Sequence, residues 1–173
     1  MKTSKAPLVL LMSGAFVYKL CCDCECQYLP LTALGIHTQK MLDKKINLLV
    51  IDDDDINIFI IKKIVEKTGY NIDMTAKSNG QLAIDFLTET LASGNSLPDL
   101  ILIDINMPVM NGWEFVEAYE TLGITKSIDL YILSSSVYEN DIEKTKSYEN
   151  VKGFISKPLS MERLIELLKE LRF

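Results

Sequence analysis

The chain has 173 residues, which is enough for one domain with a full hydrophobic core and too few for two domains of ordinary size. A hydrophobic share of 48% and a charged share of 24% are typical of a soluble globular protein. The net charge of −6 argues against non-specific nucleic-acid binding, because that function requires a basic surface.

The first forty residues differ in character from the rest. A mostly apolar run over residues 6–18 follows two lysines, and all four cysteines lie within residues 21–26. The apolar run is similar to the core of a signal peptide, but it is too short to span a bilayer as a helix. We interpret residues 1–41 as an N-terminal extension that is disordered or non-native, with Met41 as the working start. A targeting or anchoring segment and a cysteine metal or redox site are the alternatives.

From Ile46 onward, strand-like and helical patterns alternate five times along the chain. Short apolar runs predict the strands, and apolar residues spaced three and four apart predict a helix after each of them. Such alternation indicates βαβ units, and therefore a parallel sheet with helices on both faces. The predicted strands are Ile46–Ile51, Asn71–Ala76, Asp99–Ile103, Ile128–Leu133 and Val151–Ile155, and the predicted helices are Asp54–Thr68, Asn79–Ser93, Gly112–Leu122, Asn140–Ser147 and Ser160–Leu171.

The composition of each predicted strand indicates its place in the sheet. The first, third and fourth strands are apolar apart from Asn47, Asp99 and Asp129, as strands covered on both faces should be. In the second strand, apolar and polar residues alternate over Ile72–Ala76, and the fifth strand is a mixture of the two over Val151–Ile155. Both strands therefore fit the edges of the sheet. The order 2-1-3-4-5 satisfies this pattern. The predicted fold class is therefore α/β, with a doubly wound five-stranded parallel sheet.

Polar side chains follow four of the five predicted strands. The acids Asp52–Asp55 follow the first strand and Asp104 the third, while Ser134 and Lys157 follow the fourth and fifth. In a sheet of this order, ligands bind beyond the carboxyl ends of the strands, at the reversal between strands one and three. Two carboxylates 4 Å apart repel each other by roughly 4 kcal/mol at an effective dielectric constant near 20. The acids therefore predict a divalent metal and an anionic reaction partner at this edge.

The motifs at these positions resemble those of response-regulator receiver domains, the family of the chemotaxis response regulator. The resemblance covers about residues 44–172. It implies a flavodoxin-like receiver fold for a domain that we place at residues 42–173. The resemblance rests on the motifs Val50–Asp53, Ile103–Pro108, Asn111-Gly112, Leu133-Ser134 and Lys157-Pro158.

The resemblance also implies which residues accept phosphate and bind metal. Asp104 would be the phosphoacceptor, Asp53 would bind Mg²⁺ directly, and Asp52 would bind it mainly through water. The carboxylate of Asp104 and the backbone carbonyl of Asn106 would complete the protein ligands. This small number of protein ligands is sufficient, because Mg²⁺ usually keeps several water ligands. Asn106 and Ser136 would lie near the attacking water during slow self-dephosphorylation.

Three further residues complete the site that the resemblance implies. Ser134 would hydrogen-bond the phosphoryl oxygens, and Lys157 would pair with them. Phe154 would be the aromatic switch residue whose rotamer reports the phosphorylation state, although plain core packing is the other interpretation. The helix predicted over residues 140–147 has few apolar residues, so we expect it to open more easily than its neighbours and to shift on phosphorylation.

Other residues near the site have structural interpretations. An aspartate at a strand-to-helix turn is most often an N-cap, and we assign that role to Asp54 or Asp55. Trp113 is expected to pack the third helix against the sheet.

The implied function is a stand-alone receiver, a phosphoprotein of a two-component system that acts in phosphorelay signal transduction. A sensor histidine kinase or a histidine phosphotransfer protein would donate the phosphoryl group to Asp104 in the presence of Mg²⁺. A downstream protein, which the sequence does not identify, would then bind differently. We expect a cytoplasmic protein with no membrane or direct nucleic-acid contact. Autophosphorylation and autodephosphorylation would be its only activities, so it is not an enzyme toward outside substrates.

Two other functions are open. A phosphatase of the haloacid-dehalogenase type also uses an aspartyl phosphate and Mg²⁺, and Asp52 and Asp54 supply its D-x-D motif. Against this, Ile56 stands where Thr or Val is preferred, sixteen residues follow Lys157, and Asp104 has no purpose in that pattern. The second alternative is a degenerate receiver that binds proteins without being phosphorylated, and the complete set of site residues argues against it.

Overall fold

The computed structural model describes residues 10–13, 16–19, 28–30, 44–135 and 144–171. The chain divides into two units, residues 1–44 and residues 45–173. The described part of the first unit is an antiparallel sheet of three short strands, β1 (Leu10–Ser13), β2 (Phe16–Lys19) and β3 (Tyr28–Pro30). The four cysteines lie outside the described residues. The interpretation of residues 1–41 as a disordered or non-native extension stays a prediction.

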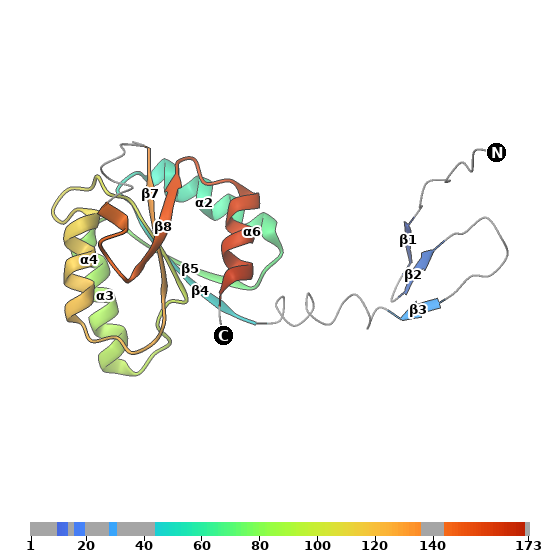
Figure 1. Ribbon diagram of the computed structural model, residues 1–173, viewed down its shortest axis with the longest axis horizontal. Coiled ribbons are helices and arrows are strands. Elements are labelled where there is room, and N and C mark those ends of the chain that lie inside the picture. The colour runs from blue at the N-terminus through green and yellow to red at the C-terminus, as the bar shows by residue number, and fades with distance from the viewer. Residues whose placement is uncertain (1–9, 14–15, 20–27, 31–43, 136–143, 172–173) are drawn as a thin grey trace. The chain divides into compact units, whose positions relative to one another are not determined.

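Five parallel strands form the sheet of the second unit (Figure 1). Their order is β5-β4-β6-β7-β8, which is the order 2-1-3-4-5 in the numbering of the predicted strands. The α/β prediction is therefore confirmed, and each strand end agrees with the prediction to within one residue. The strands are β4 (Ile46–Ile51), β5 (Ile72–Lys77), β6 (Leu100–Ile103), β7 (Asp129–Ser134) and β8 (Val151–Ser156).

Helices cover both faces of this sheet, with α2 and α6 on one face and α3 and α4 on the other (Figure 1). In the described part of the chain, no helix is both long enough and apolar enough to cross a membrane. The helix predicted over residues 140–147 lies half outside the described residues, and Lys144 and Thr145 are helical. The helices are α2 (Asp55–Thr68), α3 (Gly80–Ser93), α4 (Gly112–Thr121) and α6 (Met161–Glu170).

Capping residues fix where the helices begin and end. Asp54 is the N-cap of α2 and accepts a hydrogen bond from the Ile56 amide at 2.9 Å, which confirms the predicted structural role. Ser160 caps α6 in the same way. Gly69 and Gly94 end α2 and α3 with φ angles of 75° and 68°, in the left-handed region that glycine adopts without strain.

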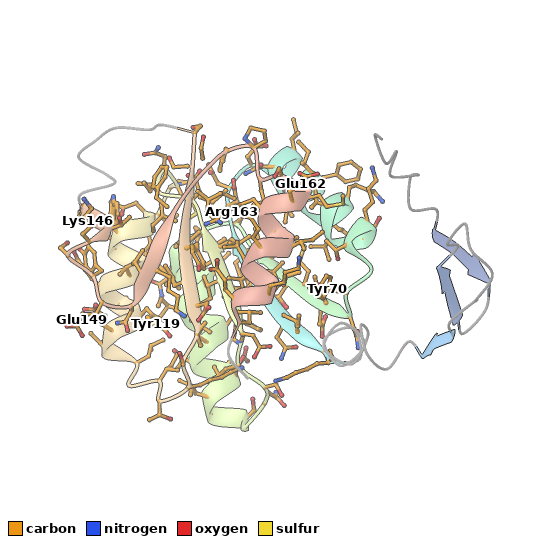
Figure 2. All side chains as sticks on the ribbon, turned by 45° about the vertical axis from the view of Figure 1, so that its right-hand side comes forward. Tyr70, Tyr119, Lys146, Glu149, Glu162 and Arg163 are labelled. Carbon is orange, nitrogen blue, oxygen red and sulfur yellow. The ribbon has the colours of Figure 1, made fainter. Side chains whose placement is uncertain are left out.

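The hydrophobic core has two halves, one on each face of the sheet. One half contains residues of α3 and α4, including Trp113, which is 8% exposed and packs against the sheet as predicted. The other half contains residues of α2 and α6. Figure 2 shows Tyr119 of α4 and Arg163 of α6 on opposite sides of the sheet. The central strands β6 and β7 are buried along their whole length, because both halves of the core cover them.

An irregularity in the pairing of β7 with β8 decides which side chains of β8 face each half of the core. Between Leu130 and Tyr131 the register shifts, and Lys152 is the extra residue of a bulge in β8. Residues three apart in a regular strand face opposite sides. Because of the bulge, Val151 and Phe154 both pack in the half of the core that contains α3 and α4.

Candidate functional site

The acidic residues of the sequence prediction converge at the carboxyl ends of β4 and β6. These strands are hydrogen-bonded neighbours, and the Asp104 amide donates to the carbonyl of Ile51 at 2.8 Å. Asp52 and Asp104 are buried, whereas Asp53 is exposed. One carboxylate oxygen of each acid lies within 4.8 Å of the other two. This spacing suits a small divalent cation with oxygen ligands.

Lys157 bridges the two buried acids. Its ammonium nitrogen lies 2.7 Å from Oδ2 of Asp52 and 2.9 Å from Oδ2 of Asp104, and its side chain is 15% exposed. Burial by itself lowers the pKa of Lys157, but the hydrogen bonds and charges of Asp104 and Asp52 raise it above its usual value. The lysine is therefore positively charged at neutral pH and compensates part of the clustered negative charge.

The oxygens of the two buried acids differ in how they are bonded. Oδ1 of Asp52 accepts the Asp54 amide at 3.0 Å, and Oδ2 accepts the side-chain amide of Asn57 at 2.5 Å in addition to Lys157. Oδ1 of Asp104, in contrast, is buried and has no hydrogen-bond partner among the described residues. An unsatisfied buried carboxylate oxygen calls for a partner such as an ion. The donor set therefore fits a divalent cation beside Asp104.

The remaining predicted site residues lie at the same edge of the sheet or close to it. Ser134 ends β7 and is fully buried, and its carbonyl accepts the Lys157 amide at 2.9 Å. Asn106 is exposed in the loop after β6. Phe154 of β8 is partly buried against the half of the core that contains α3 and α4. Ser136 lies outside the described residues.

Gly112 holds the loop that carries Asp104 against the start of α4. Its amide donates to the carbonyl of Ile105 at 2.9 Å, so the helix begins in direct contact with the loop backbone. A Cβ atom at this position would collide with the carbonyl oxygen of Asp104 and lie 2.9 Å from Cα of Ile105. Because both obstacles are backbone atoms, only glycine fits without moving the loop.

Gly112→Ala is therefore expected to lower the free energy of unfolding by roughly 2 kcal/mol, as overpacking of a tight site does. The same substitution in an unobstructed helix would instead be stabilising. Urea denaturation followed by circular dichroism measures the change. Gly153→Ala is the control, since its added Cβ meets only the ring of Tyr131, at 3.5 Å. A Gly112→Ala variant as stable as the wild type would contradict the steric account.

Asn57 also belongs to this site, although it was not predicted from the sequence. Asn57 lies on the buried stripe of α2 together with Ile61 and Val65, at spacings of four residues. A polar side chain on an apolar stripe needs a hydrogen-bond partner, and here that partner is Asp52. The signal was present in the sequence as an asparagine in phase with buried positions.

The doubly wound sheet and the acids paired with a lysine at its carboxyl edge define a class of protein, namely a small α/β protein with an acidic site beyond the carboxyl ends of its parallel strands. Comparisons identify the family. The model of the response regulator receiver domain matches residues 48–169. Two-component response regulator 24 of Arabidopsis thaliana is 31% identical over 134 residues, which cover 77% of this chain and 88% of that protein. The chain therefore belongs to the response-regulator receiver family.

Structural comparison gives the same result. A two-component response regulator from Cytophaga hutchinsonii is 33% identical, with a TM-score of 0.68, and the match covers 74% of this chain and 98% of that one. In the sequence comparison, the polar-differentiation response regulator DivK of Brucella anthropi is 27% identical over 123 residues, which cover 71% of this chain and 93% of that protein. The chain is thus homologous to response regulators of the DivK kind. Membership of this family favours a signalling module over the phosphatase alternative.

Proposed function

We propose that the chain is a stand-alone receiver that accepts a phosphoryl group on Asp104 with the help of Mg²⁺ and then changes its binding to a partner. The observation that carries this proposal is the state of the Asp104 carboxylate. It is buried, one of its oxygens is held by Lys157, and the other has no hydrogen-bond partner among the described residues. Lys157 thus orients the carboxylate, and its second oxygen is available for a metal ion or a phosphoryl group.

The residues present would hold the metal in the following way. Asp53 and Asp104 would bind Mg²⁺ directly, together with the backbone carbonyl of Asn106, and Asp52 would bind it mainly through water. When bound, the metal neutralises negative charge on the transferred group. The exposure of Asp53 suits a site that must remain open to solvent and to a phosphoryl donor.

The reaction is a phosphoryl transfer between two side chains. The bond between phosphorus and the histidine nitrogen of the donor breaks, and a bond between phosphorus and a carboxylate oxygen of Asp104 forms. The other ring nitrogen of the phosphohistidine carries a proton taken up from solvent, so the histidine leaves as a neutral imidazole when the P–N bond breaks. The transition state is loose, so the protein contributes positioning and charge compensation. Lys157 pairs with the phosphoryl oxygens, and the hydroxyl group of Ser134 donates a hydrogen bond to them.

The proposed partners follow from this chemistry. The donor is a sensor histidine kinase or a histidine phosphotransfer protein, which places the chain in the cytoplasm, where ATP charges the kinase. The phosphorylated form binds a further protein, and the contact of Ser134 with the phosphoryl group is relayed to Phe154. Residues 42–173 carry this function, and residues 1–41 are an extension to it. Outside substrates are not turned over.

Incubation with acetyl phosphate and Mg²⁺ tests the proposal, with intact-mass spectrometry as the readout. We expect one added phosphoryl group that is lost under mild base, and no incorporation when EDTA replaces Mg²⁺. Turnover of p-nitrophenyl phosphate with no stable adduct would instead indicate a phosphatase. If neither an adduct nor turnover is observed, the chain is a degenerate receiver. The phosphatase outcome and the degenerate-receiver outcome would each overturn the proposal.

A further inference from the structure

We propose that Asn57 is a positioning residue for this site, because its side-chain amide sets the orientation of the Asp52 carboxylate and thereby the affinity of the chain for Mg²⁺. This inference rests on the proposed function, since it assigns a role within the same metal site. Asn57 itself touches neither the metal nor the phosphoryl group. It acts through Asp52, to which it donates the hydrogen bond described above.

The hydrogen bond between Asn57 and Asp52 is buried on both sides. Asn57 is 7% exposed and Asp52 is fully buried, and the bond from Nδ2 to Oδ2 measures 2.5 Å. Hydrogen bonds to an ionised acceptor are shorter and stronger than neutral ones. The bond also joins two elements, because Asn57 lies in the first turn of α2 and Asp52 directly follows β4. The orientation of the carboxylate is therefore tied to the packing of α2.

Three donors hold the Asp52 carboxylate, and they are not equivalent. The Asp54 amide bonds Oδ1, while Asn57 and Lys157 share Oδ2. Lys157 also bonds Asp104, and in the proposed reaction it pairs with the phosphoryl oxygens. When the ammonium group turns toward the phosphoryl group, Asn57 becomes the side-chain donor that keeps Oδ2 in place. Asn57 thus preserves the metal site while Lys157 serves the reaction.

The neutrality of Asn57 matters as much as its hydrogen bond. A cationic donor at this position would repel the metal, and a further carboxylate would add to the repulsion among the clustered acids. An amide holds Asp52 without changing the charge of the site. Partners of this kind, which orient a ligand without binding the metal themselves, typically change metal affinity by roughly 10- to 100-fold when they are removed.

The test compares Asn57→Leu with Ile61→Ala in the full chain. Leucine has the same branching and the same number of non-hydrogen side-chain atoms as asparagine but donates no hydrogen bond. Ile61 lies one turn further along the same buried stripe and packs in the core half with α2 and α6, so its truncation destabilises the helix without touching the acids. The Mg²⁺ dissociation constant is measured by titration of Trp113 fluorescence, or by calorimetry if the emission does not change. We expect it to rise about 10-fold in Asn57→Leu and to stay unchanged in Ile61→Ala.

Each other outcome has a clear meaning. An unchanged dissociation constant in Asn57→Leu would overturn the inference, and so would an equal rise in Asn57→Leu and Ile61→Ala, because general destabilisation would then explain it. If leucine prevents folding, Asn57→Ala removes the amide without added bulk and must give the same rise. Failure of the wild type to bind Mg²⁺ and accept phosphate would overturn the proposed function itself, which separates the two failures.

Discussion

Asp104→Asn is expected to take up no phosphoryl group from acetyl phosphate under conditions in which the wild type is labelled. The substitution keeps the shape of the side chain but replaces the nucleophilic carboxylate oxygen with an amide, which does not form the acyl phosphate. It also removes one negative charge from the cluster of Asp52, Asp53 and Asp104. Because like charges close together destabilise the folded state, the variant should remain folded and at least as stable as the wild type. Intact-mass spectrometry and thermal denaturation measure both effects.

Asp54→Asn is the matched control for this experiment. It makes the same chemical change two residues after Asp52, at the exposed N-cap of α2. Asparagine caps helices about as well as aspartate, so labelling and stability should both match the wild type. Loss of labelling in Asp54→Asn would show that charge near the site, rather than the acceptor, limits the reaction. Labelling of Asp104→Asn at the wild-type level, with the same lability in base, would refute the assignment of the acceptor.

Lys157→Met is expected to slow phosphorylation by roughly 100-fold or more, which is the usual effect of removing a group that stabilises transition-state charge. It should also lower the free energy of unfolding in EDTA by about 3 kcal/mol, since the buried carboxylates of Asp52 and Asp104 lose their cation. Added Mg²⁺ should restore much of this stability, because the metal binds the folded state and no longer competes with an ammonium group. Acetyl phosphate kinetics and urea denaturation with and without Mg²⁺ measure the three effects.

The pH dependence of this stability loss follows from the raised pKa of Lys157. The hydrogen bonds and charges of the two acids favour the protonated lysine in the folded state, so its contribution is fully present below the unfolded pKa of about 10.4. It is lost as the pH rises through the folded pKa. The difference in stability between Lys157→Met and the wild type should therefore be constant across neutral pH and shrink only under alkaline conditions.

Lys152→Met provides the control for Lys157→Met, because Lys152 lies in β8, the strand that Lys157 directly follows. Lys152 also pairs with a buried acid, Asp129, at 2.7 Å, but it lies at the opposite end of β8 from Lys157. This variant can lose stability, yet Mg²⁺ should restore none of it and the phosphorylation rate should match the wild type. A rescue of Lys152→Met by Mg²⁺, or an unchanged phosphorylation rate in Lys157→Met, would contradict the role assigned to Lys157.

Much of the fold could be predicted because the apolar runs are long and the breaks between them are clear. The strand Ile46–Ile51 was predicted without error, since the apolar run Leu48–Ile51 ends abruptly at four aspartates. The edge position of β5 followed from its alternating pattern. The convergence of Asp52 and Asp104 followed in turn from the strand order, because β4 and β6 are neighbours. These features depend on local pattern and topology, which a single sequence carries.

Other features depend on contacts between distant segments, and the sequence does not display them. The bulge at Lys152 lies in a run of mixed polar and apolar residues. One extra residue there changes which face of the sheet the following side chains point to, but it leaves no mark in the composition. Gly112 was recognised within a motif, but the carbonyl that excludes a side chain there belongs to Asp104. Asn57 could have been noticed from its phase on α2, yet its partner lies on another element. The metal and phosphoryl roles of the site residues stay predictions.

The bulge in β8 has a consequence for how the protein behaves at high concentration. β8 and β5 are the two outermost strands, and a flat outer strand offers its unused backbone groups to any similar chain. The extra residue interrupts the regular spacing of those groups on β8, and a lysine with 40% of its side chain exposed stands at the interruption. A second copy would have to desolvate that charge in order to continue the ladder. Self-association by strand addition is thereby disfavoured along this side.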